Sequence, residues 1–383
     1  MKIERLELRL LKLPLVHFFE TSFGRIDEKH FIIVRVDGEG ATGFGECVAE
    51  QDPYYSAETN ETCWHIIADF IAPRVLGATF GHPRELFPAL KAIRGHNMAK
   101  AAVEMAAWDL YAKQRGEPLS RVLGGTDLRS GSVGGPAPDR IASGVSIGIQ
   151  RSLDELAAKV ERELAAGYRR IKIKIKPGWD LAAVETVRAR FGAIPLMVDA
   201  NAAYTLRDAD HLAQLDRFDL MMIEQPLDYD DIADHATLQR RLTTPICLDE
   251  SIKTVGIARE AIAAGACRII NIKPGRVGGF AESIRLHDLC ASQGIPVWHG
   301  GMLESGIGRA ANVHLSTLPN FTLPGDIAAS KRYFDPDLIE PPIEVAADGT
   351  VAVPTAPGIG VVVRDDRIAG ATLKQTVLEA AHA

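Results

Sequence analysis

Cysteine is scarce in this sequence of 383 residues, and the five cysteines are scattered singly, with no CxxC pair. Structural zinc sites and the disulfide frameworks of secreted domains both need cysteines at paired spacings. We therefore expect a reduced, cytoplasmic protein without structural zinc. The residues are Cys47, Cys63, Cys247, Cys267 and Cys290.

Long apolar runs and an excess of positive charge are also missing. No run reaches the roughly 18 apolar residues that a membrane-spanning helix needs. The N-terminus, MKIERLELRLLKLPL, alternates charged and apolar residues and lacks the apolar core of a signal peptide. The formal net charge is −7, whereas nucleic-acid binding relies on clustered Lys and Arg. These absences predict no membrane span and no nucleic-acid partner.

Glycine-rich nucleotide-binding motifs are absent as well. GFGEC near Gly43 and GRVGG near Gly275 lack the G-x-G-x-x-G spacing between a strand and a helix. The sequence therefore predicts neither a Rossmann nor a Walker site.

The composition is that of an ordinary globular protein, with 46% hydrophobic and 24% charged residues. The length suits a parallel barrel of about 250 residues plus a smaller domain. Period-two stretches up to about residue 50 predict a small antiparallel sheet. Helical patterns follow from about Ser56 to Leu76 and from Met98 to Arg115. Residues 1–128 are therefore predicted to form an α+β domain.

A second region begins after the segment from Arg129 to Gly144, which is rich in Gly, Ser and Pro and predicts a loop or linker. From Val145 onward, short β-branched runs alternate with amphipathic helical stretches, as in a parallel sheet with crossover helices. We expect residues 129–325 to form a barrel. Residues 326–383, rich in Pro and Gly, are expected to return to the first domain.

Five charged residues near the predicted strand ends repeat with the period of a βα unit. They are separated by 25, 25, 25 and 24 residues, and each ends or closely follows an apolar run. Active sites of parallel barrels lie at the carboxyl ends of the strands. Five successive strands are therefore predicted to direct these side chains to one point. The residues are Lys174, Asp199, Glu224, Asp249 and Lys273.

The three carboxylates predict a metal site. A strand-end Asp considered alone is more often a helix cap or a salt-bridge partner than a metal ligand. Three converging carboxylates, however, would repel one another without a cation, so a bound divalent ion is the natural resolution. All-oxygen ligation by Asp199, Glu224 and Asp249 favours Mg²⁺, or Mn²⁺, over zinc.

The two lysines come from strands on either side of the carboxylates, so they can face each other across the metal. A lysine desolvated near a cation can have its pKa lowered towards neutrality and act as a general base on the proton alpha to a metal-held carboxylate. Lys172 either helps to lower the pKa of Lys174 or is a salt-bridge partner. His299 either acts as a base or packs beside the site, which is the more common role for a lone histidine.

The motifs around these residues resemble those of the enolase superfamily, within its muconate-lactonizing-enzyme subgroup, whose sites pair a Lys or His base with magnesium. They are IKIKIKPGWD, VDANAAYTL, MMIEQPL, ICLDESI, NIKPGRVGG, GGMLESGIGRA and LPNFTLPGD. Two of these motifs, NIKPGRVGG and GGMLESGIGRA, together with FETSFG from Phe19 to Gly24, make the chain similar to the o-succinylbenzoate synthase and N-succinylamino-acid racemase family. The resemblance implies a (β/α)7β-type TIM barrel with an α+β capping domain built from the N-terminal region and the C-terminal tail.

The resemblance also implies roles for single residues. Lys174 would be the general base and Lys273 the opposite lysine, while Asn201 and Glu250 would support the metal ligands. A mobile loop around Phe19 to Phe23 would close over the substrate. The implied substrate-binding residues are Ser146, Arg276, Gly301, Met302, Phe19 and Phe23, of which Arg276 is linked to racemase-capable members.

Our leading hypothesis is therefore the Mg²⁺-dependent syn-dehydration of a cyclohexadiene carboxylate to o-succinylbenzoate in menaquinone biosynthesis. The alternative is racemisation of N-succinylamino acids by the same two lysines, and one enzyme can carry both activities. Dipeptide epimerisation, cycloisomerisation and a non-catalytic barrel are more remote. The expected partners are a small-molecule carboxylate and, in a homo-oligomer, further copies of the chain.

Overall fold

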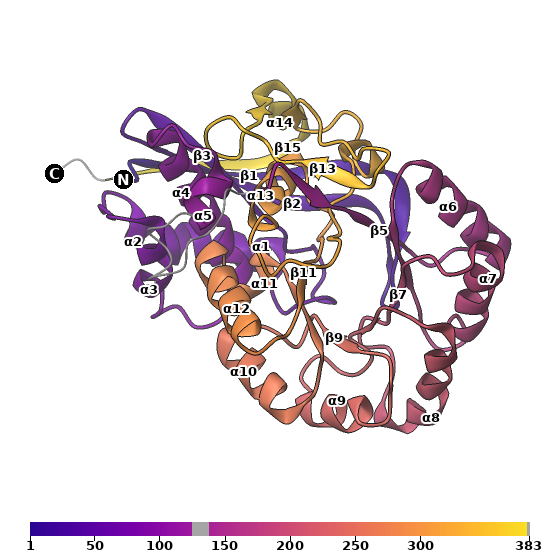
Figure 1. The fold of residues 1–383 in the computed structure, drawn as a ribbon. Coiled ribbons are helices and arrows are strands. Elements are labelled where there is room, and N and C mark those ends of the chain that lie inside the picture. The colour runs from indigo at the N-terminus through magenta and orange to yellow at the C-terminus, as the bar shows by residue number, and fades with distance from the viewer. Residues whose placement is uncertain (125–137, 381–383) are drawn as a thin grey trace.

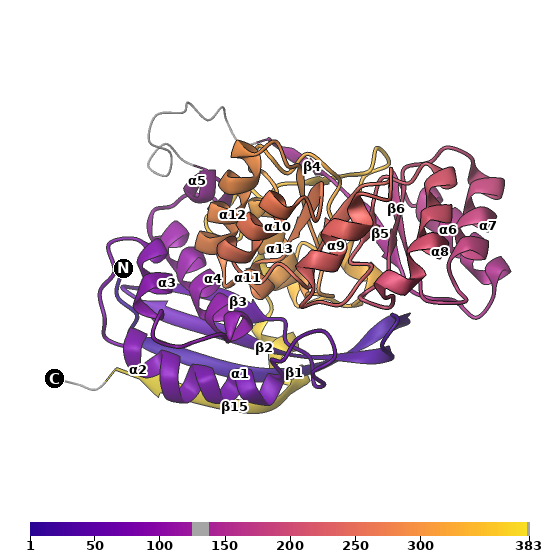
Figure 2. The same ribbon diagram turned by 90° about the horizontal axis from the view of Figure 1, so that it is seen from below.

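The computed structural model describes residues 1–124 and 138–380 (Figure 1). An antiparallel sheet with its own helices forms one layer, and a curved parallel sheet surrounded by helices forms the other. Figure 2 shows the two lying against each other. The predicted domain boundary at residue 128 and most of the predicted linker lie outside the described residues. Within those residues, no helix has the length and apolar character needed to cross a bilayer.

The capping sheet has four antiparallel strands in the order β15-β1-β2-β3. Its period-two pattern arises because alternate side chains, such as those of Leu6 and Leu8, are fully buried in an apolar core. β15 pairs with β1 from Arg5 opposite Glu379 onward, so the C-terminal tail completes the N-terminal sheet as expected. The strands are β1 (Arg5–Glu20), β2 (Arg25–Gly38), β3 (Ala41–Cys47) and β15 (Thr372–Glu379).

Two helical segments cover this sheet. The first begins at Asn60 rather than near Ser56, because the Thr59 hydroxyl caps it by accepting the N–H of Thr62 at 3.3 Å. It comprises α1 (Asn60–His65), a π-helical stretch (Ile66–Ile71) and α2 (Ala72–Val75). The second is α4 (Asn97–Gln114), which lies between the cap and the barrel and is buried along most of its length.

The glycines of GFGEC have a packing role. A Cβ atom on Gly43 would lie 2.1 Å from the carbonyl oxygen of Ala106, and one on Gly45 would lie 2.0 Å from that of Ala102. Only glycine lets β3 approach α4 this closely. The motif therefore serves the fold of the cap.

The second layer is a seven-stranded parallel sheet in the order β11-β10-β9-β8-β7-β6-β5, with helices on its outer face (Figure 1). It confirms the predicted α/β barrel with an α+β cap. Its strands are β5 (Gly144–Ile147), β6 (Arg170–Lys174), β7 (Leu196–Asp199), β8 (Ile223–Glu224), β9 (Ile246–Leu248), β10 (Ile269–Ile272) and β11 (Val297–His299). Its helices are α6 (Leu153–Ala165), α7 (Leu181–Phe191), α8 (Ala209–Leu212), α9 (Ile232–Gln239), α10 (Val255–Ala264), α11 (Pro274–Val277), α12 (Phe280–Ser292) and α13 (Gly306–Leu315).

Residues 321–326 bridge the gap between β11 and β5. Phe321 pairs with Val297, and Gly325 pairs with Ser143. The amide of Asp326 donates to the carbonyl oxygen of His299 at 2.8 Å. The ring is thereby closed, and Asp326 lies at its mouth.

The predicted loop from Arg129 to Gly144 is wrong in its last part, which contains the short strand β4 (Arg140–Ala142). β4 pairs with β13 (Thr350–Ala352), which lies far along the chain, so the local sequence carries little sign of it. The other elements are α3 (Leu86–Ala89), α5 (Leu119–Gly124), β12 (Ile339–Glu340), β14 (Val362–Val363), α14 (Asp365–Ala371) and 3-10 turns at Pro83–Glu85, Leu206–Asp208, Ala213–Phe218 and Ser330–Arg332.

Glu104, on α4, joins the cap to the barrel. Its carboxylate accepts the N–H groups of Phe280 at 2.8 Å and Ala281 at 2.9 Å, at the start of α12. It also accepts the indole N–H of Trp108 at 2.6 Å. Burial raises the pKa of Glu104 to about 7.

This raised pKa predicts a pH-dependent stability. The folded protein holds the Glu104 proton more tightly than the unfolded chain, so the stabilisation is complete below about pH 4.5 and is lost as the pH rises through about 7. Relative to Glu104→Gln, which cannot titrate, the native protein should lose up to about 3 kcal/mol of unfolding free energy over that range. Urea unfolding at about pH 5 and about pH 8 measures this. An unchanged difference between the two proteins would contradict the prediction.

Candidate active site

The five predicted residues meet at the carboxyl ends of successive barrel strands. Lys174, Asp199 and Glu224 are the last residues of β6, β7 and β8, whereas Asp249 and Lys273 directly follow β9 and β10. Beneath them, the barrel interior holds a small apolar cluster that includes Met197, Met222, Cys247 and Trp298. The strands therefore carry apolar side chains inside the barrel and charged ones at its mouth.

Lys174 contacts the neighbouring strand end. Its ammonium donates to Asp199 Oδ2 at 2.6 Å and to Asn201 Oδ1 at 2.7 Å. Lys174 is 7% exposed and Asp199 is 1% exposed. Burial would raise the pKa of Asp199, but the charges of Lys174 and Lys172 outweigh it and hold that pKa well below its usual range. The carboxylate therefore stays ionised.

Lys172 lies among three carboxylates. Its ammonium is 2.6 Å from Asp326 Oδ2, 3.0 Å from Glu224 Oε2 and 3.2 Å from Asp199 Oδ2. Burial would lower the pKa of Lys172, but these charges raise it well above its ordinary value. The charge of Lys172 is thus balanced by carboxylates, which is the salt-bridge alternative that the sequence left open.

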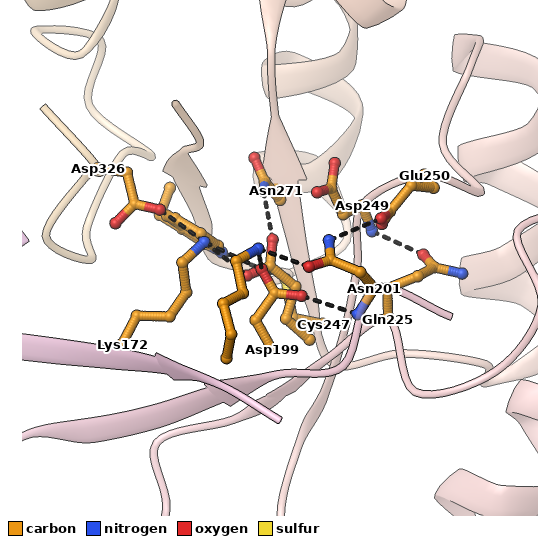
Figure 3. A network of polar contacts seen from close by, with 12 residues as sticks. Lys172, Asp199, Asn201, Gln225, Cys247, Asp249, Glu250, Asn271 and Asp326 are labelled. Atoms are coloured by element: carbon orange, nitrogen blue, oxygen red, sulfur yellow. Dashed lines mark hydrogen bonds and ion pairs between the residues drawn. The ribbon is translucent and has the colours of Figure 1, made fainter. Parts of the chain in front are cut away.

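Asp326, the last residue of the motif LPNFTLPGD, anchors this side of the site, although no role was predicted for it from the sequence. It accepts a hydrogen bond from Arg170 at 2.6 Å, and both Arg170 and Lys172 lie against the indole ring of Trp298. Figure 3 shows Lys172 directed towards this carboxylate. Its sequence signal is the motif LPNFTLPGD, which lacks the regular spacing of the other charges.

Lys273 contacts both the barrel and the cap. Its ammonium donates to Asp249 Oδ2 at 2.7 Å and to the hydroxyl oxygen of Tyr55 at 3.1 Å. Burial would lower the pKa of Lys273, but the charge of Asp249 outweighs it and raises the pKa. The Lys273 ammonium therefore lies between a carboxylate of the barrel and a phenol of the cap.

Glu224 is the central carboxylate and is fully buried. Besides Lys172, it takes a hydrogen bond from the Asn271 amide at 2.6 Å (Figure 3). Burial and the charge of Asp199 raise the pKa of Glu224 well above its ordinary value. The three carboxylates are therefore close enough to repel one another, as the sequence predicted.

A polar layer orients these groups. The Asn201 amide donates to Glu250 Oε1 at 2.9 Å, and Gln225 Oε1 accepts the N–H of Asp249 at 3.0 Å (Figure 3). Asn201 and Gln225 have φ angles of 43° and 36°, the left-handed region that side-chain-bearing residues rarely adopt. Backbone strain of this kind clusters at functional sites.

A cavity opens above the charged residues, between the cap and the barrel. Lys172, Lys174 and Lys273 line it, whereas Asp199, Glu224 and Asp249 lie beneath the lysines and do not. Of the predicted substrate-binding residues, Ser146, Gly301, Met302, Phe19 and Phe23 line the cavity. The Ser146 hydroxyl is buried without a hydrogen-bond partner among the described residues, so it is available to a ligand.

The hairpin between β1 and β2 forms part of the roof. Phe19, the second-last residue of β1, is 8% exposed, and Phe23, in the turn, is 36% exposed. The hydroxyl of Ser22 donates to the carbonyl oxygen of Asn201 at 3.1 Å, which ties the turn to the barrel mouth. The predicted lid therefore lies over the site.

Arg276 and His299 lie away from the cavity. Arg276 is buried beneath Asp249, contacts its Oδ1 atom, and donates to the carbonyl oxygen of Ile252 at 2.8 Å. His299 is fully buried, its ring stacks on Phe321, and neither ring nitrogen has a partner among the described residues. Burial lowers the pKa of His299 to about 3. Its position matches the packing role, and Arg276 reaches the site through Asp249.

The three carboxylates are of the chemical type that binds Mg²⁺, but they form ion pairs with lysine side chains. Across residues 1–124 and 138–380, no group of three or more His, Cys, Asp or Glu side chains is arranged to hold a metal as it stands. Asp199, Glu224 and Asp249 each direct an oxygen to a lysine nitrogen. The donor set of three buried carboxylates nevertheless matches the oxygen ligands that Mg²⁺ prefers, and their mutual repulsion favours an added cation.

Lysines and carboxylates lie together at the carboxyl ends of a parallel barrel, beneath an antiparallel cap. This is the arrangement of a barrel enzyme, because active sites of parallel barrels lie at these strand ends. Residues 7–124 match the model of the mandelate racemase / muconate lactonizing enzyme N-terminal domain, and residues 155–367 match that of the enolase C-terminal domain-like family. The chain therefore belongs to the enolase superfamily and is an enzyme of its mandelate racemase / muconate lactonizing enzyme group. Members of the superfamily generally use Mg²⁺.

Curated relatives cover nearly the whole chain. It is 54% identical to an o-succinylbenzoate synthase of Geobacillus kaustophilus over 359 residues, 94% of this chain and 92% of the relative. It is 47% identical to an N-succinylamino acid racemase of Thermus thermophilus over 99% of this chain and 100% of the relative. A crystal structure of an enolase superfamily member from Listeria innocua is 38% identical, with a TM-score of 0.92, over 99% of this chain and 100% of that one.

Proposed function

We propose that the chain is an o-succinylbenzoate synthase that uses Lys174 to remove the proton alpha to a carboxylate. The observation that carries the proposal is the placement of Lys174 and Lys273 in one cavity, on strands that flank three buried carboxylates. The 54% identical relative that bears this name supports the choice of reaction.

Asp199, Glu224 and Asp249 would hold Mg²⁺. When bound, the ion supplies positive charge for the substrate carboxylate and for the negative charge that develops on it. Asn201 and Glu250 support this set, because Asn201 bridges Lys174 and the Glu250 carboxylate. Lys174 and Lys273 donate hydrogen bonds to two of these carboxylates, Asp199 and Asp249. These hydrogen bonds must break where Mg²⁺ takes the same oxygen atoms.

The residues of the chain then carry the proton. The Lys174 amine takes the alpha proton, and the C–H electron pair forms an enediolate on the substrate. The C–O bond to the beta hydroxyl breaks, the departing oxygen receives the proton back from Lys174, and the products are o-succinylbenzoate and water. The Lys273 ammonium faces the other side and stabilises the enediolate by its charge.

The roof of the cavity protects this chemistry. Phe19 packs edge-on against Tyr333 with ring centroids 6.5 Å apart, and the β1–β2 hairpin reaches the barrel mouth. Exclusion of water strengthens the electrostatic interactions inside the cavity. Ser146, Gly301 and Met302 would contact the succinyl chain of the substrate.

The purified chain with Mg²⁺ is therefore expected to convert the cyclohexadiene carboxylate to o-succinylbenzoate. Proton NMR of the reaction mixture would show the aromatic product signals as the substrate signals disappear. Substrate that stays unchanged in the presence of Mg²⁺ would overturn the assignment.

The second candidate function is racemisation of N-succinylamino acids, favoured by lysines that contact opposite ends of the carboxylate row. One lysine would remove the alpha proton of one enantiomer, and the other lysine would serve the mirror image. Incubation of each enantiomer in D₂O should then place deuterium at the alpha carbon. A lack of incorporation from either enantiomer would exclude this activity.

Two further expectations stay predictions. We propose that the enzyme works in the cytoplasm and as a homo-oligomer.

A further inference from the structure

Tyr55 reaches the site from the capping domain. It lies in the loop between β3 and α1, its side chain is partly buried, and it lines the cavity. Its hydroxyl donates to Asp249 Oδ1 at 2.9 Å and accepts from the Lys273 ammonium at 3.1 Å. A phenol has one proton to donate and lone pairs to accept with, so this pair of bonds uses both abilities.

The loop that carries Tyr55 is held on both sides. The Lys29 ammonium, which is 2% exposed, contacts Glu50 Oε1 at 3.0 Å. The amide of Asn60 donates to the carbonyl oxygen of Glu50 at 2.8 Å, and the Glu58 carboxylate accepts the N–H of Met98 at 3.0 Å. The hydroxyl is thus presented by a segment that is anchored on both sides of Tyr55.

The two lysines differ in this respect. Lys174 donates to Asp199 and Asn201, which both belong to the barrel. Lys273 donates to one barrel residue, Asp249, and to Tyr55 of the cap, whose ring also lies 4.6 Å from the ammonium. Lys174 lies 6.0 Å from the cap ring of Phe19, but within residues 1–124 and 138–380 its hydrogen bonds are to the barrel, whereas Lys273 also has one to the cap.

We propose that Tyr55 is a positioning residue for Lys273, so that proton transfer on the Lys273 face of the substrate depends on the Tyr55 hydroxyl, whereas transfer on the Lys174 face does not. The inference rests on the proposed function, because it needs both lysines to act on one alpha carbon. Loss of the Tyr55 hydroxyl should therefore affect one face of the substrate more than the other. Dehydration begins at Lys174, whereas exchange through Lys273 needs its nitrogen aimed at the alpha carbon.

The test uses Tyr55→Phe in the full-length, Mg²⁺-loaded enzyme, because phenylalanine keeps the ring against Lys273 and removes only the hydroxyl. Deuterium exchange is measured for each enantiomer of an N-succinylamino acid. Lys174→Ala and Lys273→Ala show which enantiomer each lysine serves. Tyr229→Phe, whose side chain is 49% exposed, is the matched control for loss of a phenol hydroxyl.

The expected result is a loss of about tenfold in exchange of the enantiomer served by Lys273, as for one hydrogen bond to a charged group, with a much smaller loss in exchange of the other enantiomer. A merely structural role would lower both exchange rates together. Equal loss for both enantiomers, or no loss for either, would overturn the inference.

Failure of the proposed function gives a different result. If the unmodified enzyme neither dehydrates the cyclohexadiene carboxylate nor exchanges either enantiomer, the proposed function itself is wrong. If it dehydrates that substrate but exchanges neither enantiomer, Lys273 carries no proton and the role given to Tyr55 is overturned alone.

Discussion

Replacing Lys174 by alanine is expected to lower turnover by about 10²- to 10⁴-fold, the usual contribution of a positioned general base. The alanine cannot accept the alpha proton, and Lys172 already balances Asp199 from 3.2 Å. We therefore expect the fold and Mg²⁺ binding to survive. Steady-state kinetics gives the loss, and circular dichroism with Mg²⁺ titration by calorimetry separates it from a folding defect.

Lys176→Ala is the matched control. Lys176 follows Lys174 by two residues, but its side chain is 39% exposed and pairs with Glu20 at 3.6 Å. The control should turn over at the native rate. Unchanged turnover of Lys174→Ala would rule out the assignment of the base, and equal losses in both variants would point to a general effect of removing positive charge from this strand.

Removal of the divalent ion is expected to abolish turnover, and added Mg²⁺ should restore it. Glu224→Gln should weaken Mg²⁺ binding by at least about 100-fold, because it removes the central charged oxygen donor of the set. It also removes the charge opposite Lys172, which Asp326 and Asp199 still balance. Calorimetric titration with Mg²⁺ alone measures the binding.

Asp230→Asn provides the comparison for this loss of charge. Asp230 lies in the loop after β8, its side chain is 67% exposed, and it pairs with Lys253. Its Mg²⁺ affinity should equal that of the native enzyme. Full turnover after chelation, or Glu224→Gln with native Mg²⁺ affinity, would contradict the metal assignment.

The barrel and its charged residues follow from the sequence because their signals are local. Each strand is a short apolar run, and the side chain at its end is displayed at one edge by the geometry of parallel strands. The regular interval from Lys174 to Lys273 reflects one strand and one helix per unit. These residues could therefore be placed near one another before the fold was known.

Tyr55 and Asp326 could not be found in the same way. Tyr55 reaches Lys273 across 218 positions of the chain, from a loop of another domain with no regular pattern. Asp326 follows the segment that closes the ring, where the interval is broken. Such contacts depend on how the cap docks and on how the barrel closes, and neither is encoded by periodicity.

The metal site shows a further limit of the sequence argument. Repulsion among the carboxylates predicted a divalent ion, but Lys172, Lys174 and Lys273 also reach these oxygens and balance their charge. Whether a lysine contacts a carboxylate depends on the length and direction of its side chain, which the spacing of residues along the sequence does not reveal. Membership of the superfamily therefore supports a bound Mg²⁺ more strongly than the charges of the carboxylates alone.

Restoring an amine at position 174 tests the central claim most directly. Lys174→Cys should be inactive, and alkylation with 2-bromoethylamine would rebuild a lysine-like amine there through a thioether. The native enzyme treated in the same way is the control, since its five cysteines are all buried. We predict that o-succinylbenzoate formation returns with the amine. A variant that carries the amine, binds Mg²⁺ and still forms no product would contradict the assignment of Lys174 as the base.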